Sequence, residues 1–110
     1  MQFSIIENGV LVDLPLIYAW RVGGELVYVG KANGARRPLN DYPNDVRKLL
    51  AGEPYRKNKP NEFRRIHRVL ANAVIRRLPI QLEYLCNTTA TQISADKRAL
   101  IRQHNPRCND

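Results

Sequence analysis

The sequence predicts an α+β domain in which a small, mainly antiparallel β-sheet carries helices packed on its faces. Two runs of β-forming residues flank Gly23-Gly24, and a third run over residues 80–86 alternates apolar and polar side chains. Helical periodicity recurs over residues 61–77. With 110 residues and a hydrophobic content of 44%, the chain can bury one core, so we expect residues 1–110 to form a single domain.

Two hairpins are expected before the first helix. Apolar runs on either side of Asn8-Gly9, a strong turn signal, predict an additional N-terminal hairpin within residues 1–14. The main hairpin spans residues 16–31, and its glycine pair can adopt the positive φ angles that a two-residue turn requires. This hairpin places Tyr18 and Tyr28 on neighbouring strands.

Three helices are expected. A short helix over residues 44–51 lies within an otherwise irregular, proline-rich stretch. The longest helix covers residues 61–77, where apolar side chains recur at intervals of three and four and Pro60 suits the first turn. The last helix is expected to begin after Ser94 as its N-cap and to end near His104.

The charge of the chain indicates a polyanionic partner. Lys and Arg number 18 against 10 Asp and Glu, which gives a formal net charge of +8. No apolar stretch approaches the ~20 residues of a membrane-spanning helix, and no signal peptide is recognisable, so we expect a soluble, cytoplasmic protein that does not bind membranes. Cys86 and Cys108 are too few for a disulfide framework and lack metal-ligand spacing.

Two groups of cations are candidates for nucleic-acid contact. The first lies in the loop that precedes the longest helix and comprises Arg56, Lys57 and Lys59. The second forms a stripe on that helix and comprises Arg65, Arg68 and Arg76. A solvated surface is the alternative interpretation for both. His67, beside the apolar face, is a candidate general base or phosphate ligand, or alternatively a packed structural histidine.

The paired tripeptides Leu16-Ile17-Tyr18 and Tyr28-Val29-Gly30, separated by nine residues, resemble the motifs that give the GIY-YIG nuclease superfamily its name. Leu16 replaces the first glycine. An arginine-rich segment, a long central helix and a closing Pro106-x-x-Asn109 follow in the family's order. The resemblance spans residues 16–109, which is nearly the whole chain.

The resemblance implies an endonuclease that hydrolyses DNA phosphodiester bonds with one Mg²⁺ or other divalent cation. Double-stranded or branched DNA is the implied partner. Tyr18 corresponds to the general base and Tyr28 to its partner in the second motif. Arg37, with Arg36 behind it, is the candidate for stabilising charge on the phosphoryl group, although exact register would place that arginine at Pro38. Further candidate site residues are Tyr42 and Lys31. Lys31, Arg36 and Arg37 are the cations that could lower the pKa of Tyr18.

One position departs from the family pattern. The position of the metal-binding glutamate is occupied by Lys97, whose ammonium cannot coordinate a cation. Asp96 is the only carboxylate near enough to substitute, but one residue turns a side chain by about 100° around a helix. Three hypotheses follow: an endonuclease, which Lys97 would inactivate; a catalytically inactive DNA- or RNA-binding module of the same fold; and, more weakly supported, a basic RNA- or ribosome-associated protein.

Overall fold

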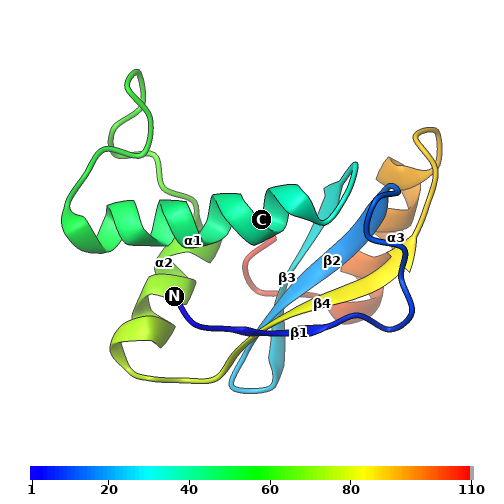
Figure 1. The fold of residues 1–110 in the computed structure, drawn as a ribbon, viewed down its shortest axis with the longest axis horizontal. Helices are drawn as coiled ribbons and strands as arrows, with labels where there is room; N and C mark the ends of the chain where they lie inside the picture. Colours follow the sequence, from blue (N-terminus) through cyan, green and yellow to red (C-terminus); the bar gives the residue numbers. More distant parts are fainter. Residues whose placement is uncertain (110) are drawn as a thin grey trace.

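A computed structural model describes residues 1–109 and contains one four-stranded sheet and three helices (Figure 1). The elements follow in the order β1 (Ser4–Ile6), β2 (Leu16–Val22), β3 (Glu25–Ala32), α1 (Arg36–Ala51), α2 (Arg65–Ile75), β4 (Ile80–Asn87) and α3 (Ile93–His104). The strand order in the sheet is β1-β4-β2-β3. Only the β1–β4 pair is parallel, so the sheet is mixed and mainly antiparallel, and the predicted fold class is confirmed.

The β2–β3 hairpin forms as expected. Gly23 and Gly24 have φ angles of 58° and 86°, which turn the chain between the strands. Trp20 lies opposite Tyr28, and Tyr18 lies opposite Gly30. Because side chains alternate along a strand, Tyr18 and Tyr28 lie on the same face of the sheet.

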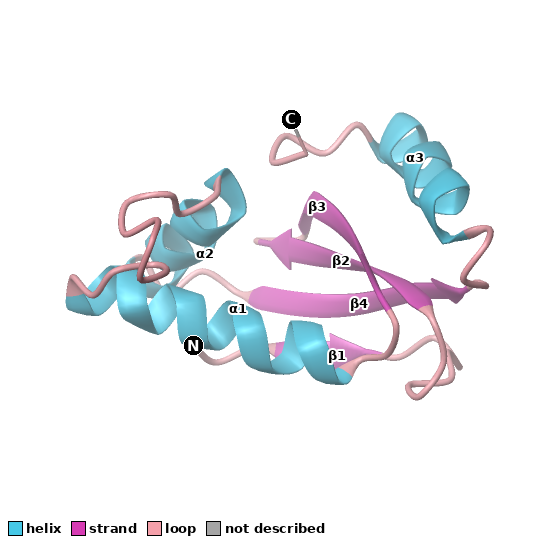
Figure 2. Cartoon of the chain, turned by 90° about the horizontal axis from the view of Figure 1, so that it is seen from above, coloured by secondary structure: helices cyan, strands magenta, loops and turns pink. Residues whose placement is uncertain are grey.

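The central strand β2 is buried on both faces. Tyr18 and Trp20 belong to a core that includes Val46 of α1 and Leu70 of α2. Ile17 and every second residue from it along β2 point to the other face of the sheet. The helix α3 contacts both β2 and β3. In the view of Figure 2 the strands lie between α1 and α3. No helix among residues 1–109 has both the length and the apolar character needed to cross a membrane.

The prediction of an additional hairpin within residues 1–14 is wrong. A turn does form, since Asn8 and Gly9 have positive φ and the amide of Val10 donates to the carbonyl of Glu7. After that turn the chain forms no second strand. Instead, Leu11 exchanges hydrogen bonds with the side chain of Asn87, and β1 pairs with the open edge of β4. Long-range pairing with β4 therefore replaces the local pairing that the turn predicted.

The helix boundaries also differ from those expected. α1 begins at Arg36, eight residues before the predicted start, and contains Pro43. Pro38 lies in the first turn, where its missing amide proton is not needed, and it is buried together with Tyr42 and Val46. Packing of this face outweighs the backbone hydrogen bond that Pro43 cannot make.

The other two helices begin at residues that the sequence did not indicate. α2 starts at Arg65, because the preceding residues form a turn in which the amide of Tyr55 donates to the carbonyl of Pro60. α3 starts at Ile93 with Gln92 as its N-cap, so Ser94 lies inside the helix. Lys97 is thus the fifth helical residue and lies beyond the first turn, where the helix dipole acts most strongly.

Candidate functional site

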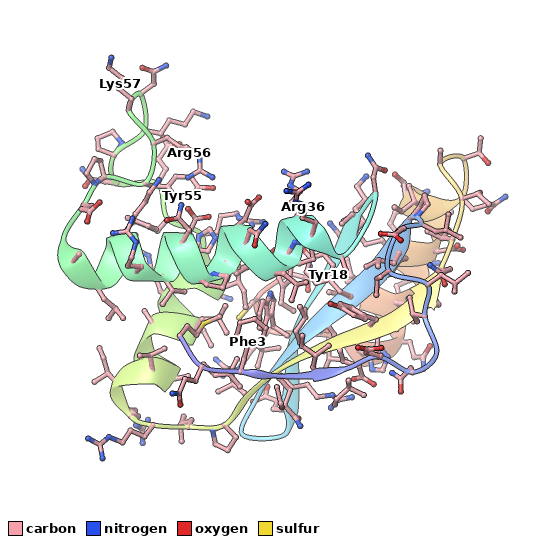
Figure 3. The ribbon with its side chains drawn as sticks, viewed as in Figure 1. Phe3, Tyr18, Arg36, Tyr55, Arg56 and Lys57 are labelled. Carbon is pink, nitrogen blue, oxygen red and sulfur yellow. The ribbon has the colours of Figure 1, made fainter. Side chains whose placement is uncertain are left out.

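A pocket of about 230 Å³ lies where the sheet, α1, the start of α2 and α3 meet. We call it the tyrosine pocket. Figure 3 shows Tyr18 between α1 and the sheet, and Tyr55 and Arg56 at the base of the loop that precedes α2. The lining residues are Tyr18, Tyr28, Lys31, Arg37, Asp41, Tyr42, Asp45, Tyr55, Arg56, Arg64, His67 and Lys97.

Three tyrosine hydroxyls and one guanidinium form a connected network in this pocket. The hydroxyls of Tyr18 and Tyr42 lie 2.7 Å apart and share a hydrogen bond. Arg64 donates from Nη1 to the hydroxyl of Tyr28 at 3.0 Å and from Nη2 to that of Tyr42 at 3.4 Å. Burial opposes the charge on Arg64, but Tyr42 and Tyr28 raise its pKa above the usual value, so it stays cationic.

Gly30 makes room for the Tyr18 ring. These two residues are paired across β2 and β3, and the ring lies over the glycine. A Cβ atom at position 30 would overlap the Cζ and hydroxyl atoms of Tyr18. The glycine in Tyr28-Val29-Gly30 is therefore a requirement of close packing, since its φ is not positive.

Tyr18 and Tyr42 are neutral at physiological pH. Burial, partly offset by the hydrogen bond with Tyr42, raises the pKa of Tyr18 to about 12. Burial and the neighbouring tyrosines also raise the pKa of Tyr42. We expected cations such as Arg37 to lower the pKa of Tyr18, but burial outweighs them. Because one of the two hydroxyls donates to the other, the hydrogen-bonded pair has one proton left to donate to an anion.

A buried carboxylate supports the wall of the pocket. Asp45 of α1 is 3% exposed and accepts a hydrogen bond from Nη1 of Arg56 at 3.0 Å. Its other oxygen lies 3.5 Å from Nε2 of His67. The ion pair between Arg56 and Asp45 anchors the loop before α2 to α1. Arg56 also lies 4.0 Å above the Tyr55 ring of the same loop.

His67 is fully buried and supports the start of α2. Its Nδ1 accepts a hydrogen bond from the backbone amide of Arg64 at 3.1 Å. Burial, reinforced by the charge of Arg64, lowers the pKa of His67 to about 4, so the ring is neutral near pH 7. A neutral ring with an accepting Nδ1 carries its proton on Nε2, which faces Asp45 at a long 3.5 Å. This geometry favours the structural interpretation of His67.

The pocket is strongly cationic. Five of its lining residues are Lys or Arg and two are Asp, so with His67 neutral the formal charge is five minus two, or +3. Both carboxylates are paired, Asp45 with Arg56 and Asp41 with Arg37 at 3.4 Å. The ammonium of Lys31 donates to the hydroxyl of Ser94 at 2.9 Å.

The structure separates the predicted site residues into two groups. Tyr18, Tyr28, Lys31, Arg37, Tyr42, Arg56, His67 and Lys97 all line the tyrosine pocket. The remaining predicted residues do not line it: Arg36, Lys57, Lys59, Arg65, Arg68, Arg76 and Asp96. Figure 3 shows Lys57 at the tip of its loop and Arg36 pointing away from the sheet. The stripe of arginines along α2 is shorter in the structure than predicted, because α2 ends at Ile75 and Arg76 is its C-cap.

Arg64 and Asp45 are pocket residues that the sequence analysis missed. Arg64 was placed inside a helix that was expected to start at residue 61, whereas it is the N-cap and its side chain reaches toward β3. Asp45 follows Tyr42 by three residues, so both lie on one face of α1. A carboxylate on that otherwise apolar face was the signal that could have identified it.

The residues of this site do not fit a divalent cation. Mg²⁺ prefers carboxylate and other oxygen ligands, but both pocket carboxylates are paired with arginines. Asp96 does not line the pocket, and its carboxylate accepts a hydrogen bond from the hydroxyl of Thr88 instead. Lys97 contributes a positive charge at the pocket wall. Among residues 1–109, no group of three or more His, Cys, Asp or Glu side chains could hold a metal ion.

Solved endonuclease structures share this fold. The GIY-YIG N-terminal endonuclease domain of UvrC from Thermotoga maritima, bound to magnesium as its catalytic divalent cation, matches with a TM-score of 0.51 and 19% identity over 89% of this chain and 85% of that chain. The E118A mutant of bacteriophage T4 EndoII matches with a TM-score of 0.59 and 22% identity over 97% of this chain and 86% of that chain. No protein-family model matches the sequence, and no curated protein is detectably similar to it.

Proposed function

We propose that this chain, which has the GIY-YIG nuclease fold, binds the phosphate backbone of double-stranded or branched DNA in the tyrosine pocket. We further propose that Lys97 prevents metal-dependent cleavage of the bound DNA. The supporting observation is the convergence of five cations and three tyrosine hydroxyls on one pocket of net charge +3. We propose DNA as the polyanion because solved endonuclease structures share this fold. The cations and hydroxyls of the pocket support a phosphate ligand.

The donors in the pocket match the needs of a phosphodiester group. Arg64 offers a planar guanidinium, which binds phosphate oxygens with two parallel hydrogen bonds. The hydrogen-bonded pair of Tyr18 and Tyr42, neutral at physiological pH, adds one hydroxyl donor. The volume of about 230 Å³ is below the roughly 300–1,000 Å³ of pockets for drug-sized ligands, so the pocket suits a small group such as phosphate.

A DNA endonuclease of the GIY-YIG type is the second candidate. The tyrosine network with Arg64 favours it, because this arrangement brings the proposed general base Tyr18 next to an anion site. Against it stand the pKa of Tyr18 at about 12 and the donor set, which offers a divalent cation an ammonium in place of a carboxylate. We therefore place DNA binding ahead of cleavage.

The salt dependence of DNA binding tests the proposal. Affinity for a labelled duplex should fall steeply between low and moderate salt, with a log–log slope of about −0.9 for each neutralised phosphate. Arg64→Gln should weaken binding and make the slope shallower by about 0.9, since one phosphate contact is lost. Fluorescence anisotropy titrations at several salt concentrations measure both quantities.

Arg77→Gln is the matched control for this experiment. Arg77 lies near Met1 and Pro79, in a surface hollow separate from the tyrosine pocket. Its substitution removes one positive charge from the same protein and should leave the slope nearly unchanged. A flat salt response of the unmodified chain, or equal effects of the two substitutions, would contradict binding of phosphate in the tyrosine pocket.

A further inference from the structure

A second hollow, of about 630 Å³, adjoins the tyrosine pocket. We call it the flanking hollow. The two share the side chains of Tyr28, Arg64 and Lys97, so they are parts of one continuous surface. A nucleoside attached to a phosphate in the tyrosine pocket has to lie beside that phosphate. The flanking hollow is the adjoining concave space, and its volume is within the range of small-molecule sites.

The lining of the flanking hollow is apolar on one side and cationic on the other. Ile66 and Cys108 are buried, and Ile101 of α3 is half-buried. Arg64, Arg65 and Lys97 provide the positive charge. A nucleotide has the matching character, since its base has apolar faces and its flanking phosphates are negative. The Tyr28 ring and Arg64, whose Cζ lies 5.7 Å from the ring centroid, are groups on which bases stack.

Asn109 and Arg65 of the hollow already form hydrogen bonds within the protein. The side-chain oxygen of Asn109 accepts from the amide of Val29 at 2.7 Å, and its nitrogen donates to the carbonyl of Val29 at 2.8 Å. Nη1 of Arg65 donates to the carbonyl of Arg107 at 2.8 Å. The amide of Asn109 therefore does not read base edges. The hollow should accept a base by stacking and apolar contact, with little dependence on its identity.

We propose that the flanking hollow receives the base of an unpaired nucleotide next to the phosphate held in the tyrosine pocket. This inference rests on the proposed function and narrows its ligand to DNA that contains an unpaired nucleotide. A paired base can enter only after it has left the stack, which costs free energy, whereas an unpaired base avoids most of that cost. DNA with an unpaired nucleotide should thus bind more tightly than the perfect duplex.

Three labelled DNAs of equal length test this inference with the unmodified chain. One is a perfect duplex, one carries a single unpaired thymidine, and one carries an abasic residue at the same bulge. The thymidine bulge should bind about tenfold more tightly than the perfect duplex, as expected when the unpairing cost is avoided. The abasic bulge is equally flexible but has no base, so it should lose most of that gain. Equal affinities for the two bulges would overturn the inference.

A pair of tryptophan substitutions on α3 locates the effect. Ile101→Trp fills the flanking hollow and should reduce the ratio of thymidine-bulge to abasic-bulge affinity to about one. Gln103→Trp adds the same ring at an exposed position of the same helix, two residues away, and should leave the ratio unchanged. A ratio that survives Ile101→Trp would overturn the placement of the base in this hollow.

The outcomes separate this inference from the proposed function. Steep salt dependence on the perfect duplex, together with equal affinity for the two bulges, would retain phosphate binding in the tyrosine pocket and reject the base site. If none of the three DNAs bound in a salt-dependent way, both the base site and phosphate binding in the tyrosine pocket would be rejected.

Discussion

Lys97 is the residue on which the proposed absence of cleavage depends. It lines both the tyrosine pocket and the flanking hollow, at the position where the resemblance implies a metal-binding glutamate. The other charged residues of the tyrosine pocket are cations or carboxylates that are each paired with an arginine. We propose that this side chain determines whether the pocket attracts a divalent cation or repels it.

Lys97→Glu should convert the chain into a metal-dependent nuclease. The substitution places a carboxylate beside Tyr28 and Arg64, and a bound divalent cation stabilises transition-state charge by several kcal/mol. Since every 1.36 kcal/mol changes a rate tenfold, nicking of supercoiled plasmid with Mg²⁺ or Mn²⁺ should rise by about a thousandfold or more. Lys97→Gln removes the charge without adding a ligand and should remain inactive. Robust cleavage by the unmodified chain that disappears in Asp96→Ala would contradict the assignment of position 97.

His67 should make stability depend on pH. Its pKa is about 4 in the folded chain and near 6.5 when exposed, so between these values the unfolded chain binds more protons. This contribution is fully present above pH 6.5 and is lost as the pH falls toward 4. A pKa shift of this size corresponds to about 3 kcal/mol in the free energy of unfolding.

The measurement is urea unfolding at several pH values in the unmodified chain and in His67→Gln. Glutamine retains an acceptor for the amide of Arg64 but does not titrate. The difference in free energy of unfolding between the two proteins should shrink by about 3 kcal/mol from pH 7 to pH 4. Parallel pH profiles would show that His67 is not held neutral by the fold.

At the scale of elements, the C-terminal segment closes the edge of the sheet. β3 is an edge strand, and unpaired edges favour aggregation. The amide of Cys108 donates to the carbonyl of Val27, and both ends of the Asn109 side chain bond to the backbone of Val29. This segment therefore covers β3 as a short additional strand would, and it holds Cys108 in the wall of the flanking hollow.

Asn109→Ala should expose this edge. The substitution leaves the amide and carbonyl of Val29 without their partner, which should lower the free energy of unfolding by about 1–3 kcal/mol. Hydrogen exchange at the Val29 amide should accelerate correspondingly. Asn58→Ala, in the exposed loop before α2, is the control and should change neither quantity. Unaltered protection at Val29 would contradict the closing role of Asn109.

At the scale of the whole molecule, the formal charge of +8 is distributed unevenly. The tyrosine pocket carries +3, and the loop before α2 adds Lys57 at its tip. In Figure 1 this loop projects above α1, whereas the C-terminal end of α2, with Arg76 and Arg77, lies on the opposite side of α1. The loop therefore lies beside the pocket, which Arg56 lines, whereas the C-terminal end of α2 lies on the other side of α1.

Removing two lysines from the loop should weaken DNA binding more than removing two arginines from the end of α2. Lys57→Gln with Lys59→Gln should make the salt slope shallower by about 0.9 for each phosphate that the loop neutralises. Arg76→Gln with Arg77→Gln removes the same charge from the opposite side and should have little effect. Equal losses in the two double variants would indicate that net charge alone, and not its placement, drives binding.

The sequence determined the features that depend on local pattern. The hairpin of β2 and β3, the strand β4 and the final helix followed from turn residues and hydrophobic periodicity. The motif spacing also identified Tyr18, Tyr28 and Tyr42, which meet in one pocket because β2 and β3 place two of them on one face. These predictions succeeded because neighbouring residues alone specify such turns and periods.

Only the tertiary structure decided the features that depend on distant partners. β1 pairs with β4 instead of forming a local hairpin, and α1 extends through Pro43 because its buried face packs against α2 and the sheet. The position of Arg64 between Tyr28 and Tyr42 joins three elements, and no spacing along the chain indicates such a contact. The physical reason is common to all three cases. Burial and long-range hydrogen bonds outweigh local propensity, and they exist only after the elements have packed.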